Sequence, residues 1–240
     1  GHPATSGTAP TAVAGVIGGG QSFSSASSQY LDVNSGIIAD AAPVTFGAWA
    51  QVNNGGQLMS RGRDGYGDGW SLDLAGTTGT SFSAAVTVTT GGAQTWGVNG
   101  TTVASPGTWY HVMAVWNGAD TFSLYVNGAM QGSTGVGKTI LRSSTIGFWF
   151  GRFFDSFLDG KMDEVRIARV ARSPAWIWAS WMCAASNTPF IAYPAALTGW
   201  PAVENQAGAT NIALTSADLV GYLSSTGDSA TAVAVYWGAT

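Results

Sequence analysis

The stretch that decides the fold runs from Gly160 to Ile177 and reads GKMDEVRIARVARSPAWI. Its first half is rich in apolar and β-branched residues and predicts a strand over Lys161–Ala168. In its second half, Ser173 is a favoured N-cap and Pro174 fits the first turn of a helix. The helix predicted over Ser173–Ala185 carries an apolar stripe, formed by Trp176, Ile177, Ser180, Trp181 and Ala184. The stretch therefore predicts a strand that closes a domain, followed by a helix that packs on it.

The rest of the chain predicts an all-β sandwich. Short segments with alternating apolar residues are separated by Gly, Asn-Gly and Asp-Gly, as in sandwiches. Both faces of Trp109–Trp116 are apolar, which predicts a central strand covered on both sides. Asn127-Gly128 predicts a tight hairpin, since both residues tolerate positive φ. The predicted strands, besides the one above, are Gln29–Val33, Val44–Val52, Gly56–Ser60, Trp70–Leu74, Ser81–Val88, Ala93–Val98, Trp109–Trp116, Thr121–Val126 and Thr145–Phe150.

Composition excludes two classes of partner. Charged residues make up only 9% of the 240 residues, and the net charge is −4. The nine Lys and Arg residues form no run, whereas a nucleic-acid groove needs clustered cations. No apolar run reaches the ~18 residues of a membrane span. We therefore expect no nucleic-acid partner and no membrane span.

Four segments in order resemble the laminin-G-like (concanavalin A-like) jelly-roll domains of bacterial surface and phage proteins. The resemblance implies a two-sheet antiparallel jelly-roll sandwich over residues 1–186, with one short C-terminal helix and an extended tail. Family members usually have a further strand before the position of Gly1, so the chain departs from the family there, which predicts an open sheet edge. The segments are Gly19–Phe23 with Gln29–Val33; Val44–Trp49; Thr108–Val112 with Leu124–Gly128; and Asp159–Ile167, which the helix at Ala171–Ile177 follows.

The tail, residues 187–240, lies outside the resemblance and is rich in Ala, Thr and Gly. Its aromatic content is too high for simple disorder, yet it is too short and too rich in small residues to hold much core of its own. We expect it to pack on the sandwich or on a neighbouring subunit. Thr231–Trp237 alternates and predicts a strand.

The resemblance also implies one calcium ion at the rim of the sandwich. The matching residue is Asp163, with Asp159 nearby, although the family's N-terminal Asp partner is missing. Carboxylates and backbone carbonyls are the hard oxygen ligands that calcium prefers. Asp64 and Asp68 form a second acidic loop, for which solvated carboxylates are the simpler interpretation.

Catalysis is not expected. Glucanases of this fold need two carboxylates about 5–9 Å apart, and the only glutamates are Glu164 and Glu204. Neighbours on a regular strand point to opposite faces, which separates Asp163 from Glu164. Asp159 and Asp163 share a face but lie ~13 Å apart along the strand.

Three further motifs have simpler structural interpretations. His111 lies in mid-strand and is expected to be a core histidine, and Cys183 a small buried hydrophobe. Gly132–Thr139 matches a phosphate-binding loop pattern, but hairpin signals precede it and no room for a helix follows. Asn99-Gly100-Thr101 fits a glycosylation sequon and also a turn.

The best candidate for ligand binding is an aromatic run before the closing strand. Trp149, Arg152, Phe153 and Phe154 combine aromatic rings with a guanidinium group, a pairing that suits sugar stacking or a protein contact. The alternative is core packing or a subunit contact.

Two functions follow from these observations. The first is a non-catalytic, extracellular or virion-surface binding or adhesion module that recognises a glycan or a surface protein. The alternative is a structural subunit of a filament or virion. In that case copies of the chain would assemble through the tail and an open sheet edge.

Overall fold

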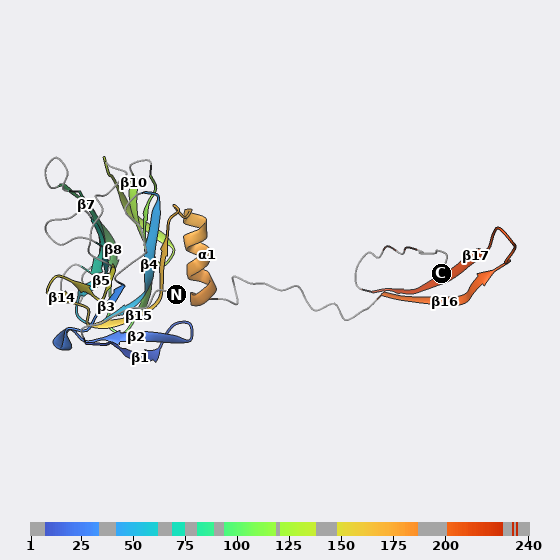
Figure 1. The fold of residues 1–240 in the computed structure, drawn as a ribbon, viewed down its shortest axis with the longest axis horizontal. Helices are drawn as coiled ribbons and strands as arrows, with labels where there is room; N and C mark the ends of the chain where they lie inside the picture. Colours follow the sequence, from blue (N-terminus) through green and yellow to red (C-terminus); the bar gives the residue numbers. More distant parts are fainter. Residues whose placement is uncertain are drawn as a thin grey trace. The chain divides into compact units, whose positions relative to one another are not determined.

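The computed structural model describes residues 8–33, 42–61, 69–74, 81–88, 94–118, 121–137, 148–186, 201–227, 232 and 234. The chain divides into two compact units, Gly1–Phe190 and Ile191–Thr240. The first unit is a sandwich of two antiparallel sheets with one helix, which confirms the predicted fold class (Figure 1).

The first sheet has seven strands in the order β1-β2-β15-β4-β9-β10-β11. β9 lies in its middle and is buried from Tyr110 to Trp116, as the sequence predicts. Asn127 and Gly128 both have positive φ (50° and 77°) and join β10 to β11 in the predicted tight turn. The strands are β1 Thr11–Ala14, β2 Gly19–Phe23, β4 Val44–Val52, β9 Trp109–Trp116, β10 Thr121–Val126, β11 Ala129–Gly135 and β15 Gly160–Ala168.

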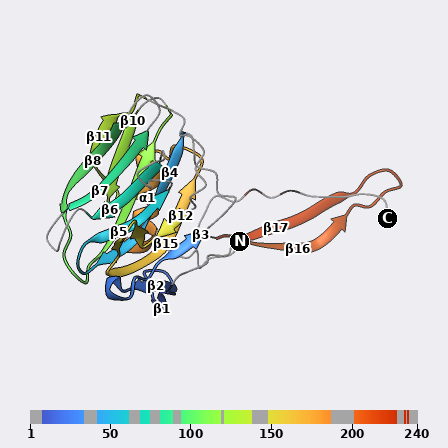
Figure 2. The same cartoon turned by 60° about the vertical axis from the view of Figure 1, so that its left-hand side comes forward.

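The second sheet has six strands in the order β3-β12-β5-β6-β7-β8 (Figure 2). A small hairpin, β13 Arg152–Phe153 with β14 Ser156–Phe157, follows β12 and leads into β15. A 3₁₀ turn, Ser25–Ser27, precedes β3. The strands are β3 Leu31–Val33, β5 Gly56–Arg61, β6 Gly69–Leu74, β7 Ser81–Val88, β8 Gln94–Val103 and β12 Phe148–Phe150.

Every strand predicted in the sandwich corresponds to an observed one, and the sequence missed β1, β2, β11 and the short strands β13 and β14 there. β1, β2 and β11 consist largely of Gly, Ala, Ser, Thr and Gln, residues with little β-pattern signal. β1 pairs with β2, so the edge strand beyond β2 is β1, which the sequence did not predict.

The main core lies between the two sheets. Phe46 of the first sheet stacks on Trp70 of the second with ring centroids 3.8 Å apart. Phe82 and Phe122 are also fully buried. At one side the two sheets are joined by Gln131 of β11, whose Oε1 accepts hydrogen bonds from the backbone N–H groups of Thr101 and Thr102 (3.1 and 2.9 Å).

β8 continues through Asn99-Gly100 to Val103, so the turn interpretation of this motif was wrong. A Cβ at residue 100 would lie 3.0 Å from the Phe82 carbonyl oxygen and 3.4 Å from a Leu124 methyl group. The glycine therefore allows the neighbouring backbone to approach closely within a strand, rather than making a turn.

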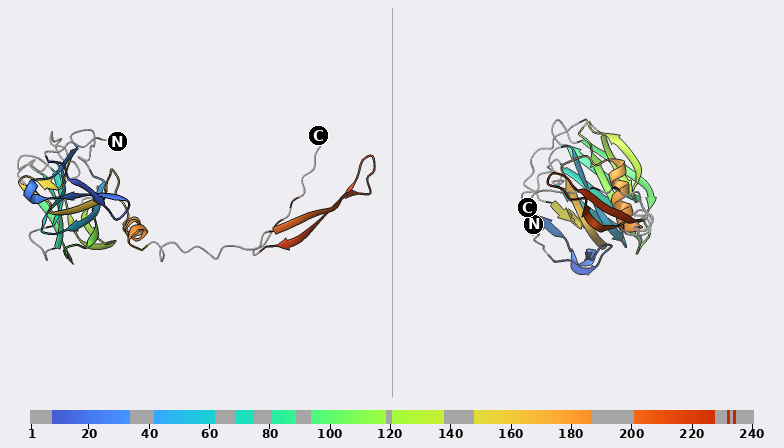
Figure 3. Two further views of the ribbon diagram at one scale, coloured as in Figure 1. Left: turned by 90° about the horizontal axis from the view of Figure 1, so that it is seen from below. Right: turned by 90° about the vertical axis from the view of Figure 1, so that its right-hand side faces the viewer.

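Helix α1, Pro174–Ala185, packs on the outer face of the seven-stranded sheet (Figures 1 and 3). The Ser173 hydroxyl accepts a hydrogen bond from Trp176 N (3.2 Å), as expected of an N-cap. Ile177 is fully buried with Met113, Val115 and Tyr125. Cys183 is exposed, so the expected burial was wrong. It lies six residues after Ile177, which is about 240° around the helix and away from the sheet.

A β-bulge in β15 corrects the regular strand that the sequence predicted. Asp163 pairs with Trp49 and Arg166 with Gly47, so three steps on β15 match two on β4. The extra residue places both Met162 and Ile167 towards the core although they are an odd number of positions apart. Glu164 adopts a left-handed conformation (φ 48°) at the bulge. After the bulge, each side chain of β15 points to the face opposite to the one it would occupy in a regular strand.

The Asp163 carboxylate stabilises this bulge. It is 6% exposed and accepts hydrogen bonds from Glu164 N at Oδ1 (2.7 Å) and from Ile17 N at Oδ2 (2.8 Å). A Cβ at residue 15 would lie 2.3 Å from Oδ2, so Gly15 is needed for the β1–β2 turn to reach the carboxylate. One side chain therefore joins the N-terminal hairpin to the closing strand.

The second unit is a two-stranded antiparallel hairpin of β16 Pro201–Thr210 and β17 Asp218–Thr226. Bulges interrupt its register at Ala202/Val203 and at Glu204/Gly208. Asn211 Nδ2 donates a hydrogen bond to Asp218 Oδ2 (2.8 Å) across the connecting turn. The sequence predicted no strand here, and the strand it predicted at Thr231–Trp237 lies mostly outside the described residues. How the tail packs stays a prediction.

We expect Asp163→Ala to lower the free energy of unfolding of the sandwich by about 2 kcal/mol, because two part-buried N–H groups lose their acceptor. Asp159→Ala is the matched control and should cost less than about 1 kcal/mol, since that half-buried carboxylate has only a 3.5 Å contact with Asn53. Denaturant unfolding in a chelator and in calcium chloride measures both. A loss that appears only with calcium would contradict the N–H account and would support the calcium site.

Candidate ligand-binding surface

Three rings surround one guanidinium group where β12 meets the β13–β14 hairpin. Arg152 Cζ lies 4.6 Å from the Tyr30 ring centroid, 4.7 Å from that of Trp149 and 5.4 Å from that of Phe157. Arg152 Nε also donates a hydrogen bond to the Phe154 carbonyl (2.8 Å). We call Arg152, Tyr30, Trp149 and Phe157 the aromatic cluster. Such cation–π contacts fix the ring positions before any ligand arrives.

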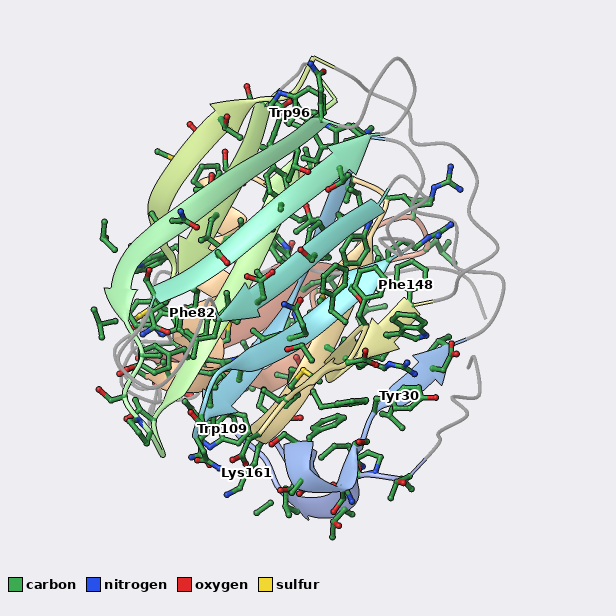
Figure 4. The ribbon with its side chains drawn as sticks, turned by 90° about the vertical axis from the view of Figure 1, so that its left-hand side faces the viewer. Tyr30, Phe82, Trp96, Trp109, Phe148 and Lys161 are labelled. Atoms are coloured by element: carbon green, nitrogen blue, oxygen red, sulfur yellow. The ribbon has the colours of Figure 1, made fainter. Side chains whose placement is uncertain are left out.

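The pairing of β12 decides which of its side chains reaches this cluster. Phe148 points into the main core, so the next residue, Trp149, lies on the outer face of the six-stranded sheet. Its Nε1 donates a hydrogen bond to Asp32 Oδ2 on β3 (3.2 Å). Figure 4 looks onto this sheet and shows Tyr30 beside β3 at its lower edge.

The turn between β13 and β14 carries a second aromatic pair, Phe153 and Phe154, which we call the aromatic tip. Their ring centroids are 4.6 Å apart in an edge-on arrangement. Phe154 has φ 51°, which is rare for a bulky residue and costs about 1–3 kcal/mol. It is 40% exposed, and the two residues that follow it, Asp155 and Ser156, are exposed too. The strained backbone of the turn therefore holds the Phe154 ring in solvent, beside the carboxylate of Asp155 and the hydroxyl of Ser156.

The structure brings the four predicted ligand residues into two groups. Trp149 and Arg152 contact each other, and both are half-buried; Phe153 is half-buried and contacts Phe154. Phe154 is the one of the four that is exposed. Because Arg152 covers one face of the Trp149 ring, the tip offers a more accessible aromatic face than Trp149 does.

The sequence pattern did not single out Tyr30, Phe157 or Asp32 as site residues. They lie before β3, in β14 and in β3, and their separation along the chain hides their proximity. The residues next to each of the three form no recognisable motif. A run of aromatic residues ending at Phe157 was visible in the sequence, but nothing there linked it to Tyr30.

Beside the cluster, the outer face of the six-stranded sheet is lined by small and polar residues. One row across the sheet, read from the strand register, runs Asp32, Trp149, Ser60, Ser71, Ala85 and Gly97. Ser60 Oγ donates a hydrogen bond to the Arg152 carbonyl (2.9 Å), so it fixes the β13–β14 hairpin to the sheet. Ser60 and Ser71 are buried, whereas Gly97 at the far end of this row is exposed.

The two predicted calcium ligands do not come together. Asp159 lies before the start of β15 beside Asn53, and Asp163 lies beneath the β1–β2 turn with two N–H partners. Among the described residues, no group of three or more His, Cys, Asp or Glu side chains could hold a metal ion. These residues alone do not fit a calcium site, which needs six to eight oxygen ligands. Asp64 and Asp68 lie outside the described residues. Calcium binding stays a prediction of the sequence.

The groups considered for catalysis have structural surroundings. His111 is 3% exposed against Trp49, with ring centroids 5.3 Å apart, which confirms a core histidine. Glu164 pairs with Arg166 on the surface (2.7 Å). The first four residues of the phosphate-loop pattern belong to edge strand β11, whereas Lys138 and Thr139 lie outside the described residues.

The comparisons with known proteins agree with the fold. A family model described as the concanavalin A-like lectin/glucanases superfamily matches residues 25–178. No curated protein matches the sequence closely enough to be reported as similar. In the part of the chain that is described, no helix is long and apolar enough to cross a membrane.

Three solved structures share the fold at low identity. The binding domain of Paraclostridial Mosquitocidal Protein 1 has 14% identity and a TM-score of 0.64, and the match covers 87% of this chain and 56% of that chain. Domain 4 of AbnA, an extracellular arabinanase from Geobacillus stearothermophilus in complex with arabinotriose, has 16% identity and a TM-score of 0.58, covering 72% and 81%. A protein from Bacteroides ovatus, described as carbohydrate-binding, has 22% identity and a TM-score of 0.52. The match covers 66% of this chain and 45% of that chain.

His111 gives the sandwich a pH dependence. Burial, and secondarily the charge of Arg166, lowers the pKa of His111 from its ordinary 6.5 to about 4. The unfolded chain therefore binds the extra proton between these values, and stability falls as the pH drops from about 6.5 towards about 4. At about 1.4 kcal/mol per pH unit, the loss due to His111 approaches about 3 kcal/mol.

Urea unfolding of the wild type and of His111→Gln across this pH range measures the effect. The difference between their free energies of unfolding should change steadily between pH 6.5 and 4 and be constant above pH 7. A difference that does not vary with pH would show that His111 is not the group responsible.

Proposed function

Since the chain belongs to the concanavalin A-like lectin/glucanases superfamily, we propose that it is a non-catalytic, extracellular module that binds a glycan through the aromatic tip. The observation that carries the proposal is Phe154. Its ring is held in solvent by a strained backbone, beside the exposed Asp155 and Ser156. Strain of this kind persists where the surrounding structure imposes it, and it is concentrated at binding sites.

The chemistry of the tip suits a sugar. The apolar face of a pyranose or furanose ring packs on an aromatic ring, while its hydroxyl groups need donors and acceptors at the edge of that ring. Asp155 supplies acceptors and Ser156 both a donor and acceptors. The aromatic cluster behind the tip holds the hairpin in place through Arg152, so little side-chain order has to be gained on binding.

Two comparisons support the choice of a glycan. Domain 4 of AbnA was solved with arabinotriose, and the Bacteroides ovatus protein is described as carbohydrate-binding. The similarity of this chain to both is in the fold, so the ligand has to come from experiment. A surface protein is the competing ligand class, since aromatic residues and Arg are also enriched at protein interfaces.

The absence of an enzyme activity is part of the proposal. The two glutamates lie in different units, Glu164 in the sandwich and Glu204 in the hairpin. His111 is enclosed in the fold. Within the sandwich, Glu164 is the only glutamate, whereas glycoside hydrolysis uses a pair of carboxylates.

We expect Phe154→Gly to abolish glycan binding without destabilising the sandwich. Glycine adopts φ 51° freely, so the relief of strain offsets the lost ring contact, and the free energy of unfolding should stay within about 1 kcal/mol of the wild type. The measurement is binding of the intact chain to a printed glycan array that includes arabinotriose, followed by calorimetric titration of any hit.

The matched control is Val170→Ala, since Val170 is also 40% exposed and lies away from the tip. Its binding should equal that of the wild type. If a glycan hit survives Phe154→Gly, the binding surface is elsewhere. If the array gives no hit while immobilised surface proteins retain the chain, the ligand is a protein and the glycan proposal fails.

A further inference from the structure

The hairpin of the second unit exposes far more apolar surface than an isolated hairpin tolerates. Leu219, Tyr222 and Val203 are each more than half exposed, and the turn adds Ile212 and Leu214. A single two-stranded hairpin is at best marginally stable in water, because it has no face to bury. These strands are ten and nine residues long, so the unsatisfied surface extends along the whole hairpin.

Both faces of β17 carry apolar side chains. Along β17, Leu219 and Leu223 lie on one face, and Val220 and Tyr222 lie on the other. A sheet that packs on a core with one face and meets water with the other shows apolar and polar residues in alternation. β17 does not show this alternation, which indicates that both of its faces are covered in the assembled protein.

The edges of the hairpin are also open. Among the described residues, β16 and β17 pair only with each other, so within that part of the chain each has one row of backbone N–H and C=O groups without a strand partner. Proteins protect such edges with lysine, proline, β-bulges or short strands. The hairpin has two bulges, at Ala202/Val203 and at Glu204/Gly208. Here residues 201–227 contain no Lys or Arg, and their one proline is the first residue of β16.

The edges of the two sandwich sheets are better protected than those of the hairpin. Edge strands β1 and β3 have only four and three residues. At the other side, edge strands β8 and β11 are joined to each other through Gln131. Edge strand β8 has ten residues, and Gln131 bonds to its backbone only at Thr101 and Thr102. Among the described residues, the hairpin therefore differs from each sandwich sheet in that both of its edge strands are long.

We propose that this hairpin is a self-association element, which pairs edge to edge and face to face with the hairpin of a second copy of the chain. Charge favours a copy over other partners. Residues 201–227 carry two acidic side chains, Glu204 and Asp218, and Asp218 already accepts a hydrogen bond from Asn211. Without cations the hairpin offers nothing to a nucleic acid or an anionic membrane.

Identical hairpins fit one another without further requirements. Each copy supplies the same two edges, of ten and nine residues, and the same apolar side chains on both faces of β17. Because the hairpin carries so few charges, two copies repel each other little. Edge pairing satisfies the exposed backbone groups, and face packing removes the valine, leucine and tyrosine side chains from water. This proposal does not depend on the glycan-binding proposal, which concerns the sandwich.

The test uses the full chain and the double variant Leu219→Lys/Tyr222→Lys, which places one charge on each face of the hairpin. Sedimentation velocity over a range of concentrations should show that the wild type forms oligomers that dissociate on dilution. In the double variant the dissociation constant should rise at least tenfold, because lysine would be buried without a partner.

The matched control is Val103→Lys on β8, because Val103 is 55% exposed and Tyr222 is likewise 55% exposed. This variant should associate like the wild type. Thermal unfolding of the sandwich, followed by tryptophan fluorescence, should be the same in all three proteins and shows that the variants fold. A wild type that is monomeric at every concentration, or oligomers unaffected by the double variant, would overturn the proposal. A Phe154→Gly chain should still form oligomers.

Discussion

The hydrogen bonds of the Asp163 carboxylate are the interaction on which the sandwich depends. The bulge in β15 gives one backbone N–H, at Glu164, no strand partner, and the carboxylate accepts it. Its other oxygen accepts the N–H of Ile17, so the β1–β2 hairpin is attached to the closing strand. Burying a charge is costly unless hydrogen bonds compensate it, and here the compensation also determines which side chains of β15 face the core.

The candidate ligand surface follows from the same closing strand. The β13–β14 hairpin leads directly into β15, and Ser60 and the aromatic cluster fix it to the six-stranded sheet. The frame behind the tip is thus rigid, while the tip itself is strained and exposed. Binding surfaces often combine these properties, because a preorganised loop loses little entropy when its ligand arrives.

The two units solve the problem of sheet edges in opposite ways. In the sandwich, edge strands β1 and β3 are short, and Gln131 joins β11 to β8 at Thr101 and Thr102. The hairpin keeps long edges and apolar faces, which in a monomer would be a liability. A chain with 9% charged residues cannot protect such edges by repulsion. The proposed recognition by the sandwich and the proposed assembly by the hairpin are compatible roles for one chain.

The sequence by itself determined the elements whose signals are local. Asn127-Gly128 predicts its turn, Ser173-Pro174 predicts the start of α1, and the apolar strand Trp109–Trp116 predicts its central place, because φ preferences, capping and side-chain periodicity act within a few residues. Likewise, the run from Trp149 to Phe154 was visible as a candidate site.

Only the tertiary structure decided the features that depend on distant partners. The bulge at Asp163 lets Met162 and Ile167 face the same core. The exposure of Cys183 follows from which face of α1 contacts the sheet. Tyr30 and Asp32 reach the aromatic cluster only because β3 pairs with β12. The hairpin of the tail escaped prediction because its long strands lack a regular alternation. Such contacts join residues that are far apart in the chain, and no local pattern records them.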